Sequence, residues 1–377
     1  MIAIRIKQFI TVVLLALFSF ISRFLPKGKY WVICERGTDA RDNGWHFYKY
    51  MKKQHPETKV YYIINKQSPD YEKVKEDAVR YGSLKNYWVV TRAEKLISTH
   101  IAKFVPYMGG EIKKLFPGIE QRFCFLQHGV ISNYINFLHR KNVRMNLFVC
   151  GAKPESDFIK EKYGHEDGVV QYTGLARYDS LHNVNTKKQI LIMPTWRNYI
   201  RTKEDFLRSD YCVQWQALLE NEQLIKLLKE NEFELVFYPH HEFQKYLDCF
   251  HSKDARIKIA SFNDCDVQTL LKESALLITD YSSVFFDFGY MRKPVIYFHF
   301  DADSFWGRHH DRGYFNHNTD GFGKVCDACE EVIDEIQNCF NNNFDLEPVY
   351  SERLSRFFPL YDQNNCKRIY EKIVEKR

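Results

Sequence analysis

The sequence lacks the glycine-rich loops with which many α/β proteins hold phosphate groups. No GxGxxG segment follows the first apolar run, and no GxxxxGK[ST] segment occurs in the 377 residues. In the dinucleotide-binding and P-loop classes, those loops cradle a diphosphate on backbone N–H groups where a helix begins. Both classes therefore lack their signature here, and a phosphate site would have to be built from other residues.

A second CxxC pair and a nucleophile elbow are also missing. Of ten scattered cysteines, only Cys326 and Cys329 form a close pair, and no other CxxC accompanies it. A lone CxxC in an acidic, helix-like context is a weak zinc or redox signal, so these thiols are interpreted as structural. Scattered unpaired thiols favour a reducing compartment. No G-x-S-x-G segment surrounds Ser282, which disfavours a Ser-His-Asp hydrolase.

Positive charge and one apolar run gather near the start of the chain. Residues 1–53 hold ten Lys or Arg against three acids, and 9–21 read FITVVLLALFSFI. As a helix this run is about 20 Å long, short of the roughly 30 Å of a bilayer core. Because basic residues flank it on both sides, we expect it to lie on or dip into the anionic cytoplasmic face of the membrane. A cleaved signal peptide and a plain buried helix are the alternatives.

The whole chain is globular in composition, with 45% hydrophobic and 27% charged residues, and after the N-terminal run it alternates short apolar runs with amphipathic stretches. This alternation predicts an α/β fold of two Rossmann-like, doubly wound lobes with parallel sheets. The first lobe has strands at 30–34, 60–64, 95–99, 123–127, 146–150 and 169–173, and the second at 190–194, 234–238, 256–260, 275–279 and 295–300. The expected domains are a membrane-associating segment 1–28, lobes 29–180 and 181–350, and closing helices 351–377.

Polar clusters follow five of these strands, where an α/β sheet places its chemistry. They are ERGTDARDNG after 30–34, HGV at 128–130, PTWRN at 194–198, PHH at 239–241 and DYSS at 280–283. Each cluster alone has a plain structural explanation, such as a turn, a surface side chain or, for Ser282 and Ser283, a helix cap. Together they supply donors for an anion, with few carboxylates for a metal.

Single residues within the clusters suggest roles. His128 precedes Gly129, which permits a sharp turn, and a histidine is well suited to take a proton near neutral pH. Arg197 and Arg312 offer forked donors for phosphate. Adjacent His240 and His241 are a poor metal pair, because neighbouring side chains of an extended backbone point apart.

These motifs resemble the CDP-glycerol glycerophosphotransferase family of teichoic acid primases and polymerases. The resemblance is carried, in order, by HGV, PTWRN, PHH, TDYSSVFFDF, KPVIYF and RGYF, with RDNG at 41–44 and the tail YDQNNCKRIYEKI, and it spans about 30 to 375. The chain departs from the family pattern at Gln127, at the segment 130–135, at His241 and at 321–324.

The resemblance implies a GT-B-like fold and transfer of a polyol phosphate from a CDP-polyol to a hydroxyl of a lipid-linked glycan, with release of CMP. Glycerol phosphate is the family default, and ribitol phosphate and a capsule-type acceptor stay open. The family's essential histidines correspond to His128 and His240. Its donor-binding residues correspond to Thr195, Arg197, Asp280, Ser282, Ser283 and Arg312, and secondary candidates are Asp42, Asn43, Gly129 and Asp287.

The expected mechanism is direct in-line transfer, with His128 as base and the second lobe neutralising the leaving CMP. No compact carboxylate cluster indicates a metal site, so no cofactor is expected, although Mg²⁺ is compatible with the pattern. The expected partners are the CDP-polyol, the lipid-linked acceptor and an anionic membrane surface, and no nucleic acid. A GT-B glycosyltransferase using a nucleotide sugar and a non-catalytic membrane scaffold are the alternatives.

Overall fold

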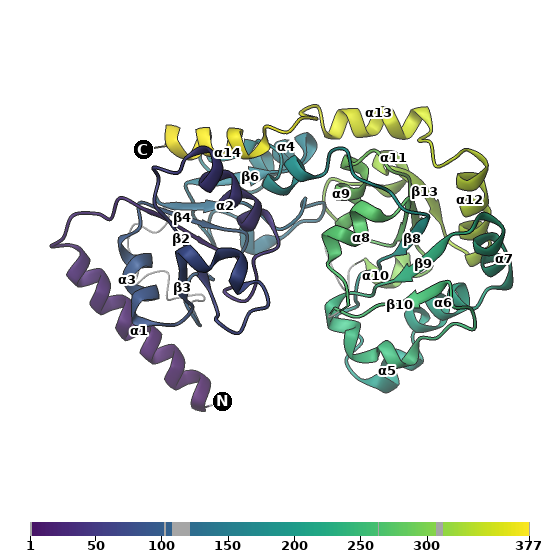
Figure 1. Cartoon of the computed structure of the whole chain (residues 1–377), viewed down its shortest axis with the longest axis horizontal. Helices are drawn as coiled ribbons and strands as arrows, with labels where there is room; N and C mark the ends of the chain where they lie inside the picture. The colour runs from purple at the N-terminus through teal and green to yellow at the C-terminus, as the bar shows by residue number, and fades with distance from the viewer. Residues whose placement is uncertain (1, 102, 108–120, 263, 307–311, 377) are drawn as a thin grey trace. The chain divides into compact units, whose positions relative to one another are not determined.

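The computed structural model describes residues 2–101, 103–107, 121–262, 264–306 and 312–376 (Figure 1). The chain divides into two compact units. Unit 1 comprises residues 1–130, 136–180 and 362–377, and unit 2 comprises 131–135 and 181–361. The change of unit at 180/181 coincides with the expected end of the first lobe. The separate closing domain expected at 351–377 is wrong, because its two helices fall in different units.

Unit 1 is built on a parallel sheet in the order β3-β2-β1-β4-β5-β6-β7. Its strands are β1 Trp31–Cys34, β2 Val60–Ile64, β3 Ala78–Arg80, β4 Lys95–Ser98, β5 Phe123–Phe125, β6 Leu147–Cys150 and β7 Val170–Tyr172. Its helices are α1 Ile2–Ser22, α2 Asn43–Gln54, α3 Leu84–Arg92, α4 Lys153–Lys162 and α14 Asn365–Glu375, with short 3₁₀ segments Tyr71–Asp77, Asn136–Leu138 and Ala176–Ser180.

Unit 2 repeats the plan with a parallel sheet in the order β10-β9-β8-β11-β12-β13. Its strands are β8 Gln189–Ile192, β9 Glu234–Phe237, β10 Ile257–Ile259, β11 Leu276–Thr279, β12 Val295–Phe298 and β13 Gly323–Cys326. Its helices are α5 Lys203–Leu207, α6 Asp210–Leu219, α7 Glu222–Asn231, α8 Val267–Glu273, α9 Val284–Tyr290, α10 Ala302–Phe305, α11 His317–Asp320, α12 Cys329–Asn341 and α13 Pro348–Phe357, with a 3₁₀ segment His241–Cys249.

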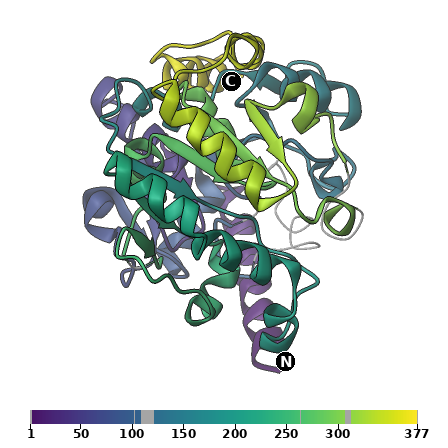
Figure 2. The same cartoon turned by 90° about the vertical axis from the view of Figure 1, so that its right-hand side faces the viewer.

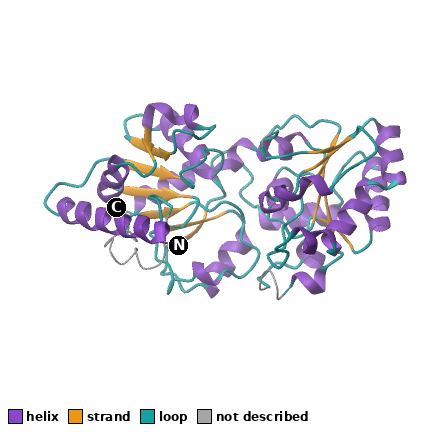
Figure 3. Ribbon diagram, turned by 90° about the horizontal axis from the view of Figure 1, so that it is seen from below, coloured by secondary structure: helices purple, strands orange, loops and turns teal. Residues whose placement is uncertain are grey.

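Both sheets have the strand order of a doubly wound Rossmann fold, 3-2-1-4-5 and onward, as expected. In each unit the strands form the middle layer and helices lie outside them (Figure 3). Helix α12, for example, packs along β12 and β13 (Figure 2). The strands are buried almost throughout because helices cover both faces, which explains their continuous apolar sequences.

Strands β3 and β13 and helix α3 are among the elements that the sequence-based expectation did not include. Strands β3 and β13 are short, and β13 begins at Gly323 in a segment that resembles a turn. Helix α3 follows a Gly-Ser pair and is rich in aromatic and β-branched residues, and α13 begins at a proline. Helices α6 and α7 are separate because Asn221 accepts hydrogen bonds from the N–H groups of Gln223 and Leu224 and so starts α7.

The apolar N-terminal run forms helix α1, which docks on α3 along one stripe. Thr11, Leu15 and Ser19, spaced four residues apart, are buried, and the Thr11 hydroxyl lies 3.1 Å from the Tyr87 hydroxyl. Large apolar side chains on the rest of the helix stay exposed, among them Phe9 and Phe20. Among the described residues, no helix has both the length and the apolar character needed to cross a membrane.

Candidate functional site

In unit 1, two histidine rings stack at the carboxyl edge of the sheet. His128 follows β5 and His100 follows the neighbouring strand β4. Their ring centroids lie 4.9 Å apart, with an angle of 11° between the planes. The sequence-based reasoning missed His100, although a polar residue directly after the apolar run 95–99 is the same signal that identified the other clusters.

Burial lowers the pKa of both imidazoles. Desolvation, with a smaller contribution from His128, lowers the pKa of His100 to about 3. The His128 side chain reaches solvent, yet the protein atoms crowded around its ring desolvate it and lower its pKa, and the nearby Asp42 carboxylate only partly opposes this. His128 is therefore neutral at pH 7 and able to accept a proton.

A set of polar contacts fixes the backbone that carries His128. Asn43 donates from Nδ2 to the Gln127 carbonyl at 2.9 Å. Arg177 donates from Nη1 to the Asp42 carboxylate at 2.7 Å and to the His128 carbonyl at 3.1 Å. Asp42 and Asn43 thus hold the loop rather than reach a substrate in this geometry. Arg177 is a positioning residue that sequence reasoning missed.

The turn before His128 differs from the expected one. The left-handed backbone conformation falls on Gln127, with φ of 60°, and not on Gly129, which is buried. The buried Gln127 side chain donates to the Val149 carbonyl and to Glu155, which compensates for the strain of a non-glycine residue in this region.

Glu35, the residue after β1, anchors the segment 41–44. Its buried carboxylate accepts hydrogen bonds from the backbone N–H groups of Arg41, Asp42 and Trp45, at 2.8–3.0 Å. Burial, followed by the charge of Asp42, raises the pKa of Glu35 to about 8. The RDNG segment is therefore part of the support for His128.

In unit 2, the Arg197 side chain is fully buried, and its guanidinium pairs with the carboxylates of Asp280 and Asp301. Its Nε lies 2.7 Å from Asp301 Oδ2, its Nη2 2.9 Å from Asp301 Oδ1, and its Nη1 2.9 Å from Asp280 Oδ2. Burial alone would lower the pKa of Arg197, but the two carboxylates outweigh it and the pKa is raised. The fork expected to bind a diphosphate is thus occupied by protein. Asp301 lies 104 residues away in sequence, which is why the pattern gave no sign of it.

Asp280 organises the ends of β8 and β11. Its Oδ1 accepts hydrogen bonds from the N–H groups of Thr195 at 2.7 Å and Tyr281 at 2.6 Å. Its other oxygen lies 2.9 Å from Arg197 Nη1, and the carboxylate is fully buried among these protein groups. Thr195 Oγ1, in contrast, is buried and has no hydrogen-bond partner among the described residues. A buried hydroxyl in this condition is a candidate ligand contact.

Ser282 and Ser283 precede helix α9, but neither caps it. Ser283 occupies the N-cap position with helical dihedral angles, and its side chain makes no capping hydrogen bond. The plain structural alternative for these two serines, a side-chain cap, is therefore not formed, and both hydroxyls are half-buried. Asp287 lies buried in the first turn of α9.

His240 is brought beside the PTWRN segment. It lies at the start of the 3₁₀ segment 241–249, where its Nδ1 accepts from the Glu242 N–H at 3.3 Å. Its ring stacks on Trp196, with centroids 6.0 Å apart and planes at 15°, and also contacts His241. Two motifs separated by more than 40 residues in sequence therefore meet at the carboxyl edge of β8 and β9.

Arg312 is exposed, with its guanidinium 5.4 Å from the centroid of the Trp306 ring. The next residue must be glycine, since a Cβ on Gly313 would lie 2.1 Å from the Ser132 carbonyl oxygen. Ser132 belongs to the segment 131–135, which packs within unit 2 directly after the His128 loop in sequence. Within the described ranges, no three His, Cys, Asp or Glu side chains gather as a metal site.

Comparison with known proteins assigns the chain to a family. A family model described as CDP-Glycerol:Poly(glycerophosphate) glycerophosphotransferase matches residues 16–375. The chain belongs to this family.

Family members with curated names share most of this chain. The minor teichoic acid biosynthesis protein GgaB of Bacillus subtilis (strain 168) is 33% identical over 364 residues, covering 92% of this chain and 39% of GgaB. The teichoic acid poly(glycerol phosphate) polymerase of the same strain is 25% identical over 388 residues, covering 95% of this chain and 49% of the polymerase. The chain thus spans less than half the length of these two relatives.

Solved structures confirm the fold. A variant of the wall teichoic acid polymerase TagF superposes with a TM-score of 0.71 at 18% identity, covering 100% of this chain and 98% of the TagF chain. Staphylococcus aureus MnaA, in a co-structure with UDP, superposes with a TM-score of 0.56 at 12% identity, covering 90% of this chain and 95% of MnaA. This member of the glycerophosphotransferase family therefore has the two-sheet α/β fold that the sequence predicted.

Proposed function

We propose that this chain transfers a polyol phosphate from a CDP-polyol to a hydroxyl of a lipid-linked glycan or polymer in teichoic-acid-like surface glycan synthesis. Membership of the glycerophosphotransferase family makes CDP-glycerol the first donor to test. The names of the relatives, a poly(glycerol phosphate) polymerase and GgaB, support a teichoic acid as the acceptor class. The observation that carries the proposal is the neutral, solvent-reaching His128 at the carboxyl edge of its sheet.

In this mechanism His128 acts as the general base. The acceptor hydroxyl gives its proton to the imidazole as its oxygen attacks the phosphorus that bears the polyol. A new P–O bond forms on one side, the P–O bond to the CMP phosphate breaks on the other, and CMP leaves. Arg177, Asp42 and Asn43 hold the His128 backbone, and His100 holds its ring by stacking.

The donor-binding role falls to the groups of unit 2 that remain free to reach a ligand. These are the Thr195 hydroxyl, which has no partner among the described residues, the uncapped Ser282 and Ser283 hydroxyls and the exposed Arg312. His240, which stacks on Trp196, is a further candidate. They would hold the diphosphate and neutralise the charge that develops on CMP. We assign Arg197 to a different role from the one its motif suggested: it fixes Asp280 and Asp301 and thereby the loop that carries Thr195. Mg²⁺ is compatible with this chemistry as a partner of the diphosphate.

We also propose that the chain acts at the cytoplasmic face of the membrane, attached through α1. The support is the row of exposed apolar side chains on α1 and the basic residues that follow it. A helix of this kind lies in the interface with its apolar side chains among the lipids and its basic flanks near anionic headgroups. The lipid-linked acceptor would then reach the site from the bilayer.

The test is to incubate the full chain with a lipid-linked acceptor and, in turn, CDP-glycerol, CDP-ribitol and a panel of nucleotide sugars. Release of CMP with a phosphate-containing product supports the proposal, and the better of the two CDP-polyols names the polyol. Release of a nucleoside diphosphate with a phosphate-free glycoside would instead establish a GT-B glycosyltransferase. Binding of the acceptor without turnover of any donor would establish a scaffold.

A further inference from the structure

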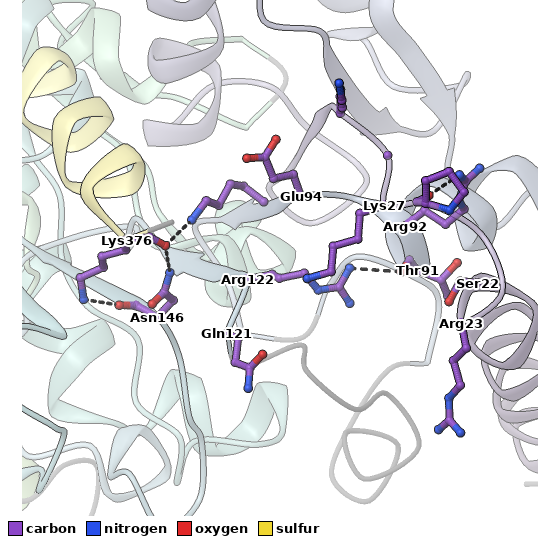
Figure 4. Close-up of a pocket in the computed structure, with 14 residues that line it drawn as sticks. Ser22, Arg23, Lys27, Thr91, Arg92, Glu94, Gln121, Arg122, Asn146 and Lys376 are labelled. Atoms are coloured by element: carbon purple, nitrogen blue, oxygen red, sulfur yellow. Dashed lines mark hydrogen bonds between the residues drawn. The ribbon is translucent and has the colours of Figure 1, made fainter.

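A hollow lies at the opposite edge of the sheet of unit 1 from His128. Its volume is about 1190 Å³, and it is bordered by residues that precede strands β1, β4, β5 and β6, by the end of α1 and by the end of the chain (Figure 4). The residues that matter to the argument are Arg23, Lys27, Arg92, Lys95, Arg122 and Lys376. Because His128 lies at the carboxyl ends of the same strands, this hollow is separate from the proposed transfer site.

The hollow is strongly basic. Among the described residues that line it there are seven Lys or Arg side chains, and Glu94 is the single acid. Neutral oxygens hold several of these cations. Arg92 donates to the Pro26 carbonyl at 2.7 Å, Lys95 to the Lys376 carbonyl at 2.9 Å, and Lys376 to the Asn146 carbonyl. A carbonyl orients a cation but leaves its charge uncompensated.

No carboxylate within the described ranges pairs with Arg92, Lys95 or Lys376 at ion-pair distance. Lys95 is buried, and Arg92 Nε is buried with no hydrogen-bond partner among the described residues. Buried cations are normally paired, since leaving water is costly for an unpaired charge. In Figure 4 the ends of Lys27 and Arg122 point toward the same region of the hollow. This concentration of like charge favours an anionic occupant.

The position of the hollow indicates what kind of anion. Ser22 and Arg23, at the end of α1, form part of its wall. Phe20 near this end of the helix and Phe24 just after it are exposed, with 59% and 75% of their surfaces accessible. Arg92 is also linked to α1, because its guanidinium lies over the Trp88 ring and Trp88 contacts Phe18 edge to face. A basic hollow beside an exposed apolar helix end matches a molecule with a phosphate head and apolar tails.

We propose that this hollow binds the phosphate headgroup of an anionic phospholipid, whose acyl chains lie along the exposed apolar side chains of α1. The proposal rests on the membrane attachment proposed above and makes it specific. The headgroup fixes α1, and with it unit 1, at a defined depth in the interface. The guanidinium and ammonium groups that line the hollow can donate hydrogen bonds to the oxygens of a phosphate diester.

The test uses dihexanoyl phosphatidylglycerol below its micelle concentration, titrated into the full chain and followed by calorimetry. We expect saturable binding of one lipid per chain. The double variant Arg23→Gln/Lys27→Gln removes two exposed cations that have no hydrogen bond or ion pair with other described residues, and should weaken binding at least tenfold. The matched control Lys53→Gln/Lys160→Gln loses the same charge from exposed positions on α2 and α4 and should bind within twofold of the unsubstituted chain.

Further ligands separate the sources of phosphate. Dihexanoyl phosphatidylcholine has the phosphate without net charge and should bind at least tenfold more weakly. Glycerol 1-phosphate and a short poly(glycerol phosphate) have the phosphate without acyl chains, and binding of either as tightly as the lipid would overturn the proposal in favour of a soluble or polymeric phosphate. Equal effects of the two double variants would also overturn it, because only diffuse charge would then matter.

The transfer reaction is measured on the same preparation. CMP release from CDP-glycerol without saturable lipid binding refutes the headgroup site alone. Lipid binding without CMP release from any CDP-polyol refutes the proposed transfer and leaves the headgroup site standing. Unfolding midpoints of the double variants show whether either substitution acts through folding.

Discussion

The rings of His100 and His128 stack at 4.9 Å although the two residues follow different strands. Two imidazoles this close cannot both carry a positive charge at low cost, because the like charges repel. His128 lowers the pKa of His100 in this way, while burial is the main cause that keeps His128 itself in the form that accepts a proton; the stacking limits the rotation of the His128 ring. Since β4 and β5 are neighbours in a parallel sheet, the pairing follows directly from the strand order.

Substituting His128 should remove the reaction without removing the donor. We expect His128→Ala to lower kcat by at least about a hundredfold, because a positioned general base contributes about 10²–10⁴ to a rate. CDP-glycerol affinity, measured by calorimetry, should stay within twofold. Arg312→Ala should show the reverse pattern, with weakened donor binding. His251→Ala changes an exposed surface histidine of unit 2 and should leave both quantities unchanged. Loss of donor affinity in His128→Ala would reject its role as base.

The pH dependence of transfer should move in opposite directions in two variants near His128. Because the pKa of His128 is lowered in the folded chain, the base form persists below the usual titration range of histidine, and activity should fall only at more acidic pH. The Asp42 carboxylate raises this pKa and Arg36 lowers it. Asp42→Asn should therefore shift the acidic limb of kcat/KM to lower pH, and Arg36→Gln to higher pH. Shifts of the same sign would contradict His128 as the titrating group.

Arg197 should matter first for stability. Arg197→Gln leaves Asp280 and Asp301 buried without their cation, and removal of one partner from a buried ion pair typically costs about 3–5 kcal/mol. We expect a loss of that size in the free energy of unfolding, measured with urea. Arg201→Gln, at an exposed position four residues on, should change it by less than about 0.5 kcal/mol. If the Arg197→Gln chain were fully stable but bound the donor more weakly, Arg197 would instead contact the phosphate directly, as the motif suggested.

Ser282 and Ser283 offer a test of capping against ligand binding. Replacing a serine that does cap a helix, such as Ser209 at the start of α6, by alanine lowers the free energy of unfolding by about 1 kcal/mol. Since neither serine caps α9, we expect Ser282→Ala/Ser283→Ala to leave the unfolding free energy nearly unchanged and to raise the dissociation constant for CDP-glycerol. Ser209→Ala should do the opposite. If both variants lost stability equally and bound donor normally, the two serines would have only a structural role.

Membrane attachment through α1 predicts a defect confined to vesicle binding. Phe9→Ser/Phe20→Ser replaces two exposed aromatic side chains and removes apolar surface from the proposed contact with lipid. Binding to anionic vesicles in a sedimentation assay should fall by at least tenfold. The unfolding midpoint should change little, because the stripe that docks on α3 is formed by Thr11, Leu15 and Ser19. Unchanged sedimentation would refute attachment through this helix.

The strands and the polar clusters at their ends could be predicted because burial on both faces leaves continuous apolar runs, and those runs end where the polar residues begin. The roles of individual residues were harder. In the PTWRN segment Arg197 resembles a phosphate ligand, and only the fold shows that its guanidinium is paired with Asp301. Arg177 acts through neighbours far along the chain, which no local pattern reports, whereas His100 follows an apolar run and was open to the same reasoning as the other clusters. The uncapped serines likewise depend on dihedral angles that composition does not encode.

Helix α14 joins unit 1 after the chain has passed through all of unit 2. The Asp179 carboxylate accepts hydrogen bonds from the N–H groups of Asn365 and Cys366, and Arg368 donates to the Thr173 carbonyl. During synthesis from the N-terminus, residues 181–361 therefore emerge, and are free to fold, before these contacts exist. Of the two units, unit 1 is therefore the one whose native structure is completed later, and its assembly depends on residues 362–376 having left the ribosome.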